Sequence, residues 1–246
     1  MDKIVPIIVP LYYSYHLVNK LIQSIKLLEK ESDYQIVFID NTPKEDRKVI
    51  SYLSEEKPIH KITVINWSDT ENLLFTKSVN TLFKGDAGSD IDFDEFVVMN
   101  PDCFPLTENW ITEMRKCLRL DKRIATVGSI QYSEEGKRFK NIWHCGCSWK
   151  GENEHKCHPL DWRHINVREV VDYMLQNKKS IQVDGNTGTG IMVDRKIFEE
   201  LNGLDDKKYP HYSSDADYCL RATNNGYIHL CSYVEMFHNP GKSVKK

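Results

Sequence analysis

The stretch Phe96-Val97-Val98-Met99-Asn100-Pro101-Asp102 indicates which class of fold this chain adopts. Four apolar residues run directly into Asn-Pro-Asp, and a short apolar run closed by a proline predicts a buried strand that ends where the chain turns. In open α/β sheets, ligands bind outside the carboxyl ends of the strands. Asp102 is therefore a candidate ligand for Mg²⁺ or Mn²⁺, which suit a carboxylate accompanied by phosphate oxygens. A solvated turn aspartate is the alternative.

The residues before this turn alternate between strand and helix patterns. The apolar run Ile4–Val9 predicts a strand buried on both faces, and the helical spacing of apolar residues from Leu17 to Leu28 predicts a helix capped by Ser14. Further strands are predicted at 35–39, 62–65 and 96–99, and further helices at 45–53 and 72–83. This order predicts an α/β fold with a doubly wound, mostly parallel sheet and helices on both faces.

Three of the predicted strands end in groups suited to ligand binding. The endings are Pro10-Leu11-Tyr12, Asp40-Asn41 and Asn100-Pro101-Asp102. Because parallel strands end at one edge of a sheet, these groups are expected to outline a cleft. Neither Gly-x-Gly-x-x-Gly nor a P-loop pattern follows the first strand, which argues against a dinucleotide or ATPase site. Asp40 is still suited to a ribose hydroxyl or a base edge.

The second half of the chain is less regular. It predicts a helix at 110–120, a strand at 124–132, a Trp-, His- and Cys-rich section at 139–165, a helix at 167–176, a glycine-rich turn at 185–190, an apolar segment at 191–193 and a helix at 195–201. No repeat or long linker interrupts this series, which predicts a single domain.

The composition excludes several classes of function. The net charge of −3 gives no general attraction to nucleic acid, so none is expected as a partner. No window is long and apolar enough to predict a transmembrane segment, although peripheral membrane contact stays open. The seven cysteines are odd in number and lie mostly in or beside apolar runs, which indicates free thiols in a reducing compartment. A cytoplasmic location is expected on these grounds.

Two later segments carry further candidate groups. Asp215 lies in Tyr212-Ser213-Ser214-Asp215-Ala216-Asp217, where serines and aspartates predict the start of a helix. A carboxylate at such a position suits a general base, and helix capping is the structural alternative. His238 lies in Phe237-His238-Asn239-Pro240, and a neutral imidazole suits Mn²⁺ together with a carboxylate. A plain surface histidine is the alternative there.

Taken in order, these segments resemble the inverting GT-A glycosyltransferases, especially family 2 and its rhamnosyltransferase-like members. The resemblance extends over almost the whole chain and rests on the joint order of motifs that are each weak alone. The matching segments are Ile8-Val9-Pro10-Leu11-Tyr12, Asp40-Asn41-Thr42, Glu71-Asn72-Leu73-Leu74-Phe75 with Asn80, Asn100-Pro101-Asp102, Gly188-Thr189-Gly190 through Gly203-Leu204-Asp205, Ser214-Asp215-Ala216-Asp217-Tyr218-Cys219-Leu220-Arg221, and His238 with Gly241 and Ser243. Three positions depart from the family pattern: Leu74 replaces a glycine, Asn100 the first acidic residue of the metal motif, and Ser214 the glutamate before the base.

The resemblance implies one GT-A domain over residues 1–246, with a nucleotide-binding half at 1–102 and an acceptor and catalytic half at 103–246. It implies inverting hexosyl transfer from a UDP- or dTDP-linked sugar to a hydroxyl of a glycan or glycoconjugate, as in polysaccharide biosynthesis. Asp215 would be the base, and Asp102 with His238 would hold Mn²⁺ or Mg²⁺ against the donor diphosphate. The donor-binding residues that it implies are Pro10, Leu11, Tyr12, Asp40, Asn72, Asn80, Asn100, Gly188 and Gly190.

Other interpretations stay open for the protein and for its Cys- and His-rich section. Trp143, His144 and Asp217 are candidates for the acceptor side, with plain packing as the alternative for the tryptophan. Zinc ligation is conceivable at this section but lacks the paired Cys-x-x-Cys spacing of common structural sites; the candidates are His144, Cys145, Cys147, Cys157 and His158. The alternative function is a catalytically silent nucleotide-sugar or glycan-binding module. A sugar nucleotidyltransferase is disfavoured because its early glycine-rich loop is absent.

Overall fold

The computed structural model describes residues 3–47, 61–66, 72–83, 91–134, 141–149, 157–159 and 167–239. Their strands form one large mixed sheet in the order β10-β12-β6-β11-β4-β1-β2-β3, with β5 beside β12 and β7 beside β6. The strands are β1 (Val5–Leu11), β2 (Tyr34–Asp40), β3 (Lys61–Asn66), β4 (Glu95–Val98), β5 (Cys103–Pro105), β6 (Ile124–Tyr132), β7 (Ile142–His144), β10 (Ile181–Val183), β11 (Ile191–Asp194) and β12 (Ile228–His238). β8 (Cys147–Trp149) and β9 (Cys157–Pro159) form a separate hairpin.

The first half of the chain forms the parallel part of the sheet. β1 pairs in parallel with β2 and β4, and β2 with β3, because their nearly continuous apolar runs are buried between helices on both faces. Leu11 lies opposite Asp40, and Ile8 lies opposite Val98. The carboxyl ends of β1, β2 and β4 therefore meet at one edge of the sheet, which confirms that the three predicted strand endings lie together.

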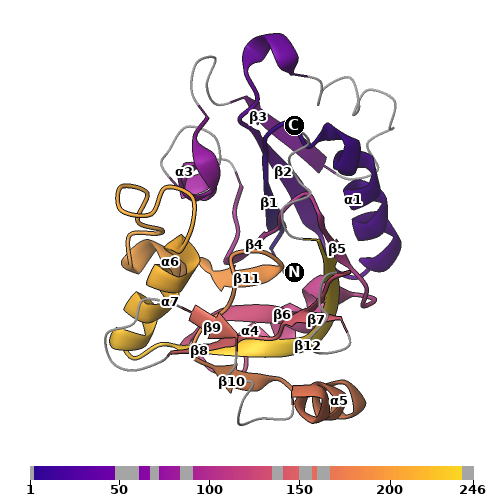
Figure 1. Ribbon diagram of the computed structural model, residues 1–246, viewed down its shortest axis with the longest axis vertical. Coiled ribbons are helices and arrows are strands. Elements are labelled where there is room, and N and C mark those ends of the chain that lie inside the picture. The colour runs from indigo at the N-terminus through magenta and orange to yellow at the C-terminus, as the bar shows by residue number, and fades with distance from the viewer. Residues whose placement is uncertain are drawn as a thin grey trace.

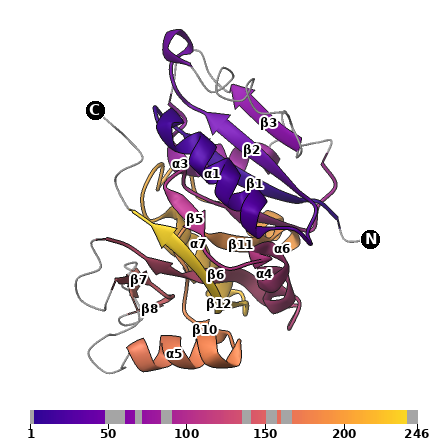
Figure 2. The ribbon, with the colours of Figure 1, turned by 90° about the vertical axis from the view of Figure 1, so that its right-hand side faces the viewer.

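The second half adds antiparallel strands and brings the end of the chain back to the same edge. β11 lies antiparallel between β4 and β6, whereas β12 runs parallel to β6 with a register shift between Cys231 and Glu235. Beyond that shift β12 continues to His238 and pairs with β5, which begins directly after Asp102. Figures 1 and 2 show the end of β12, in yellow, beside β5.

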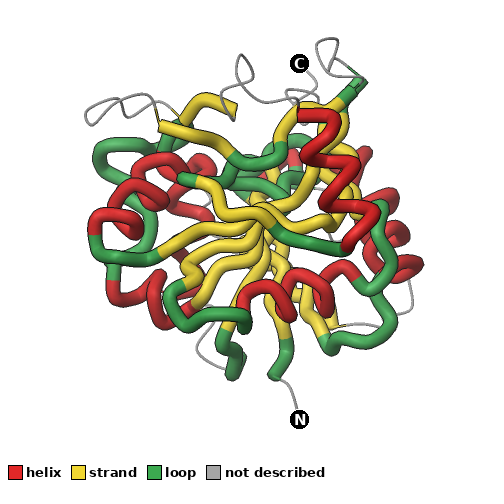
Figure 3. Tube along the Cα trace, turned by 90° about the horizontal axis from the view of Figure 1, so that it is seen from below, coloured by secondary structure: helices red, strands yellow, loops and turns green. Residues whose placement is uncertain are grey.

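Helices cover both faces of the sheet because neighbouring residues of a strand point in opposite directions. Ile7 of β1 belongs to a core cluster with α1 (Tyr15–Leu28) and α4 (Trp110–Leu118). Ile8 belongs to the cluster on the opposite face with α3 (Leu74–Asn80), α6 (Arg195–Glu200) and α7 (Ser214–Asn224). α5 (Val167–Asn177) closes a third cluster with β7, β10 and β12. Figure 3 shows the curled sheet between the helical layers.

Some elements differ from the sequence-based expectation. Ser14 precedes α1, but its hydroxyl donates to the carbonyl of Tyr12 and makes no capping hydrogen bond to the helix. Within the predicted helix at 45–53 only a 3₁₀ turn, Lys44–Asp46, is described, and 48–53 lie outside the described residues. The pattern does not predict β12 or the short strands β5, β7, β8, β9 and β10, since three-residue strands show too little periodicity and polar residues interrupt β12.

Among the cysteines whose side chains the structure describes, all but one follow the expectation of free thiols. Cys103, Cys117, Cys145, Cys219 and Cys231 are free and buried. Cys147 is disulfide-bonded, so the expectation is wrong there. Cys147 begins β8, and its register partner in the β8–β9 hairpin is Pro159. Among the helices that the structure describes, none has the length and apolar composition needed to cross a bilayer.

Candidate active site

Asp102 and His238 are brought together by the pairing of β5 with β12. His238 lies opposite Cys103 in the register, which places it beside the aspartate that precedes β5. Nε2 of His238 lies 3.6 Å from Oδ1 of Asp102, and both side chains are buried. The two residues predicted as metal ligands therefore face one another in the fold.

Gln131 of β6 determines which nitrogen of His238 carries the proton. Its amide nitrogen donates to the carbonyl of Thr189 at 2.6 Å, and a carbonyl can only accept. The amide oxygen is therefore the atom that lies 3.1 Å from Nδ1 of His238, and it can only accept in turn. Burial lowers the pKa of His238 to about 4, so the ring is neutral with its proton on Nδ1. The lone pair of Nε2 then points toward the Asp102 carboxylate.

This arrangement fits a divalent cation. A carboxylate oxygen and an imidazole lone pair that face each other are two acceptors, and His238 Nε2 is buried without a hydrogen-bond partner among the described residues. An ion between them would satisfy the imidazole lone pair and be attracted by the carboxylate. In the described part of the chain no three His, Cys, Asp or Glu side chains gather into a metal group. The rest of the coordination shell would come from water and from oxygens of a bound ligand.

The glycine-rich segment 188–190 is hydrogen-bonded to Asn100, which follows β4, and to β6. The backbone N–H of Asn100 donates to Oγ1 of Thr189 at 2.7 Å, and Ser129 Oγ donates to the carbonyl of Gly190 at 2.9 Å. Gly190 has φ +61°, and a Cβ there would lie 2.6 Å from Sδ of Met236. A side chain is therefore excluded at this position, and the segment is held rigidly against β6 and β12.

Asp215 lies in the first turn of α7 and is held by backbone donors. Its Oδ2 accepts from the N–H of Gly188 at 2.7 Å, and its Oδ1 accepts from the N–H of Ala216 at 2.9 Å. A Cβ on Gly188 would lie 3.2 Å from Cβ of Asp215 and 3.0 Å from Phe75. Burial raises the pKa of Asp215, while the backbone hydrogen bonds oppose that shift. A fixed carboxylate with a raised pKa suits a general base.

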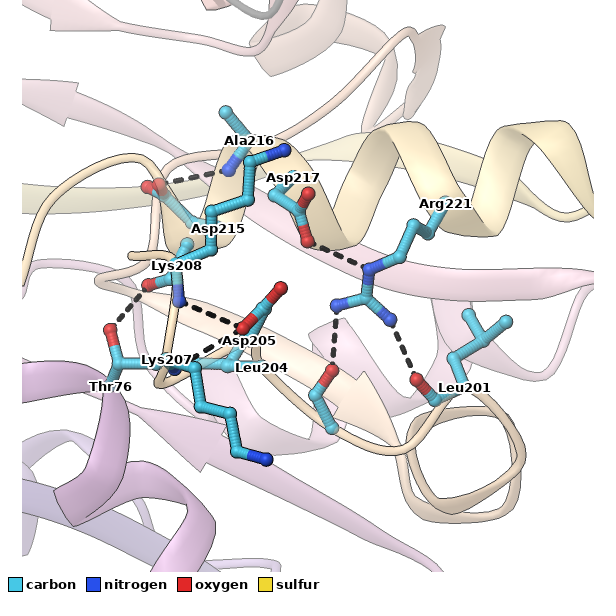
Figure 4. A network of polar contacts seen from close by, with 12 residues as sticks. Thr76, Leu201, Leu204, Asp205, Lys207, Lys208, Asp215, Ala216, Asp217 and Arg221 are labelled. Atoms are coloured by element: carbon cyan, nitrogen blue, oxygen red, sulfur yellow. Dashed lines mark hydrogen bonds and ion pairs between the residues drawn. The ribbon is translucent and has the colours of Figure 1, made fainter. Parts of the chain in front are cut away.

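Asp217, on the same helix, has a different set of contacts. Its Oδ2 accepts from Nε of Arg221 at 2.7 Å, and the other two guanidinium nitrogens of Arg221 donate to the carbonyls of Leu201 and Gly203. Figure 4 shows Asp215 and Asp217 directed at separate partners. Asp217 therefore anchors the turn that follows α6.

The residues predicted to bind the nucleoside lie at the ends of β1 and β2. Asp40 is fully buried, and its carboxylate accepts from the hydroxyl of Tyr15 at 3.0 Å and from the N–H of Thr42 at 3.0 Å. Asn41 bonds to Ser78 and to the N–H of Leu73 and so ties this edge to α3. Pro10 and Tyr12, on either side of the buried Leu11, are partly exposed.

Asn72 precedes α3 and Asn80 is its last residue, and the two side chains have different contacts. Asn72 is exposed, and its Oδ1 accepts from the N–H of Leu74 near the start of the helix. Asn80 is buried and bonds both the N–H of Leu204, at 3.0 Å, and its carbonyl, at 2.8 Å. Asn80 thus joins α3 to the turn before α7, and in this structure its amide is occupied by the chain itself.

The candidate acceptor residues of β7 point in opposite directions. Trp143 has 41% of its surface exposed, whereas His144 has 8%. Successive side chains of a strand alternate between its faces, so these two residues do not line one surface. In the possible zinc section, Cys145 is a free buried thiol and Cys147 is disulfide-bonded. The side chains of Cys157 and His158 lie outside the described residues.

Hollows of the described part of the molecule include one beside Asp215 and one away from the candidate site. A cavity of about 30 Å³ lies beside Gly188 and Asp215 and is lined by apolar side chains such as Phe75 and Phe198. This apolar wall accounts for the desolvation of Asp215. A larger hollow of about 390 Å³ lies between α4, α5 and β12, and its lining includes Glu113, Lys178 and Tyr233 but none of the candidate site residues.

No protein-family model and no curated protein sequence matches the chain. Among solved structures it is similar to the mannosyltransferase PcManGT from Pyrobaculum calidifontis in complex with GDP-Man and Mn²⁺, with a TM-score of 0.65 and 14% identity over 98% of this chain and 58% of that chain. It is also similar to GalNAc-T7 with UDP, GalNAc and Mn²⁺, with a TM-score of 0.66 and 13% identity over 97% of this chain and 44% of that one. This chain has the GT-A fold. It spans about half the length of these two neighbours.

Within this GT-A fold, sequence reasoning missed the residues that orient the site. Gln131 connects His238 to Thr189 of the glycine-rich segment, and the hydroxyl of Tyr15 occupies the Asp40 carboxylate. A buried glutamine inside the apolar strand at 124–132 is a detectable irregularity. Its partners are Thr189, which precedes β11, and His238 of β12, and contacts between residues so far apart in sequence leave no local pattern.

Proposed function

We propose that this chain is a metal-dependent glycosyltransferase that transfers a sugar from a nucleoside diphosphate sugar to a hydroxyl of a glycan or glycoconjugate, with inversion at the anomeric carbon. The observation that carries this proposal is the pair formed by Asp102 and the unprotonated Nε2 of His238, 3.6 Å apart at the edge where the strand ends gather. The GT-A fold supports it, as does the presence of Mn²⁺ in the structures of both neighbours.

Each part of the site has a definite task in this reaction. Asp102 and His238 would hold Mn²⁺ or Mg²⁺, which when bound supplies positive charge that stabilises the departing diphosphate. Gly188 and Gly190 allow the backbone to approach the donor sugar, and Thr189 keeps that backbone in place through Asn100 and Gln131. Asp215 accepts the proton of the attacking hydroxyl at a carboxylate that Gly188 and Ala216 hold in a fixed orientation.

The test is release of nucleotide from a panel of sugar donors. Purified protein is incubated with UDP-, dTDP- and GDP-linked sugars in the presence of Mn²⁺, Mg²⁺ or EDTA, and the free nucleoside diphosphate is measured. We expect release that requires the divalent cation and increases with the correct acceptor. The anomeric configuration of the product, read by NMR, tests inversion. Metal-independent release, or none with any donor, would contradict the proposal.

A silent binding module is the second candidate function. Asn100 favours it, because an amide replaces the first acidic residue of the metal motif and leaves Asp102 as the only carboxylate of the candidate pair. Such a module would bind a nucleotide sugar and release no nucleotide. The donor panel therefore separates the two functions when binding to the same donors is measured by calorimetry.

A further inference from the structure

His144 lies on the same face of the sheet as the metal pair. β7 and β12 flank β6 on opposite sides, and His144 is directly opposite Gln131 in the antiparallel β6–β7 pairing. Directly opposed residues of antiparallel strands point to the same face. Gln131 in turn bonds to His238, so the three side chains His144, Gln131 and His238 form a polar row across three strands.

The backbone determines the tautomer of His144. The N–H of Gly146 donates to Nδ1 of the ring at 3.1 Å, and a backbone N–H can only donate. Nδ1 therefore carries a lone pair, and in the neutral ring the proton is on Nε2. Burial, and to a lesser extent the neighbouring His238, lowers the pKa of His144 to about 4, so the neutral form prevails.

The turn that supplies this donor is itself fixed. Gly146 has φ +93°, and a Cβ there would collide with the side chain of Val183. Cys147 is bonded in both directions to the segment that leads into the glycine-rich turn: its N–H donates to the carbonyl of Gly185, and its carbonyl accepts from the N–H of Asp184, both at 3.0 Å. The orientation of the His144 ring is therefore set before any ligand binds.

His144 and His238 thus have opposite tautomers. His238 presents a lone pair at Nε2, which suits a metal ion, whereas His144 presents an N–H at Nε2, which cannot bind a metal ion and can only donate. Among the described residues the ring has one hydrogen bond, the one at Nδ1, so none is found at this N–H, and 8% of the residue's surface is exposed. A neutral donor beside a cation site is suited to an anionic oxygen that the cation also attracts.

We propose that His144 is a binding residue for the diphosphate of the donor, to which Nε2–H donates a hydrogen bond, and that it is not a ligand of the metal ion. This inference rests on the proposed function for its ligand class. It assigns a separate role to each histidine: His238 holds the cation, and His144 contacts the anion that the cation recruits. The same contact would persist on the nucleoside diphosphate after the sugar has left.

The first experiment separates binding of the metal from binding of the anion. Mn²⁺ alone is titrated by electron paramagnetic resonance, and UDP, GDP and inorganic pyrophosphate are titrated in the presence of Mn²⁺ by calorimetry. His144→Phe keeps a planar ring without the donor, and His144→Gln restores an N–H near the position of Nε2. His16→Phe, at an exposed histidine of α1, is the matched control, and thermal melting checks that each variant is folded.

We expect H144F to bind Mn²⁺ as the wild type does and to bind the diphosphates about ten- to a hundred-fold more weakly. H144Q should recover much of that affinity, and H16F should match the wild type. Equal diphosphate binding by wild type and H144F would overturn the role of His144 while leaving the proposed function intact. Loss of Mn²⁺ binding in H144F would show that His144 is a metal ligand. A wild type that binds no diphosphate would overturn the proposed function itself.

The second experiment observes the tautomers directly. Two-dimensional ¹H–¹⁵N spectra through long-range couplings distinguish a protonated ring nitrogen from one with a lone pair. We expect a protonated Nε2 in His144 and a protonated Nδ1 in His238, in the protein without added nucleotide. A lone pair on Nε2 of His144 would overturn the proposal whatever the protein binds.

Discussion

Asp40 and Asp102 both lie at the carboxyl ends of parallel strands, but the atoms around their carboxylates differ: donors surround one, and an acceptor faces the other. Asp40, at the end of β2, receives hydrogen bonds from a hydroxyl and a backbone N–H of the chain. Asp102, after β4, faces the lone pair of an imidazole at 3.6 Å. Donors surround the Asp40 carboxylate, whereas the imidazole lone pair beside Asp102 is an acceptor, and a cation placed between the two would suit both. Whether a strand-end aspartate is a candidate metal ligand therefore depends on whether its neighbours donate or accept hydrogen bonds. Its position at the end of a strand is not enough.

The same contrast recurs within α7. Asp217 is paired with Arg221 and fastens the turn after α6, whereas Asp215 is held only by backbone N–H groups and lies in a desolvated setting. Backbone donors orient a carboxylate without neutralising it. Asp215 thus keeps the capacity to accept a proton, while Asp217 is committed to a structural ion pair.

The largest expected effect, on the rate of sugar transfer, comes from comparing Asp215 with Asp217. Asp215→Asn removes the proposed base and should lower the rate of sugar transfer by about a hundred- to ten-thousand-fold, while donor affinity is kept. The measurements are nucleotide release with acceptor present and calorimetry with the nucleoside diphosphate. Asp217→Asn is the matched variant: it should cost about 1 kcal/mol in unfolding free energy and leave the rate of the folded protein nearly unchanged. A D215N protein that transfers sugar normally would show that the base is another group.

The next largest effect compares Asp102 with Asp40. Asp102→Asn should weaken Mn²⁺ binding by at least about a hundred-fold, since even residues that merely orient metal ligands contribute ten- to a hundred-fold. Asp40→Asn should instead lower the unfolding free energy by about 2 kcal/mol, because a buried charge-assisted network is disturbed. Electron paramagnetic resonance with Mn²⁺ and urea denaturation measure the two quantities. If D40N lost Mn²⁺ and D102N did not, the contrast between the two strand ends would be reversed.

A smaller effect is expected at Gln131, which orients His238. Gln131→Met keeps the length of the side chain but loses the acceptor for Nδ1 and the donor to Thr189. Affinity for Mn²⁺ should fall by about ten- to a hundred-fold. The long-range ¹H–¹⁵N spectrum should at the same time show a mixture of His238 tautomers. Unchanged affinity together with a changed tautomer would mean that the ring finds its orientation without Gln131.

The sequence predicts the parallel part of the fold well because it depends on local patterns. The strands at β1, β2 and β4 are nearly continuous apolar runs, and their polar endings follow directly in the chain. Asp102 is for the same reason detectable from the seven-residue stretch alone.

The contacts that give these residues their roles are not local. His238 reaches Asp102 only because β12 crosses a register shift and pairs with β5, and neither element has a clear sequence pattern. Likewise, Tyr15 lies 25 residues from Asp40, and nothing in the spacing shows that its hydroxyl occupies that carboxylate. Family resemblance predicted Asp102 and His238 as metal ligands, but the tautomers of His144 and His238 required the three-dimensional network.

The smallest expected effect is the dependence of stability on pH at Asp215. Burial raises the pKa of this carboxyl in the folded protein above its value in the unfolded chain. The folded state therefore favours the protonated form, and the stabilisation that this gives is lost as the pH rises through the folded pKa. Activity needs the deprotonated base and rises over the same range. From acidic to neutral pH, the melting temperature of the wild type should therefore fall relative to that of D215N. The transfer rate of the wild type should increase over the same range. His144, His229 and His238 titrate in both proteins, so their contributions cancel in that difference. A melting-temperature difference that moved the other way would mean that the backbone donors at Gly188 and Ala216 outweigh burial, and that Asp215 is held as a charged anchor in the manner of Asp217.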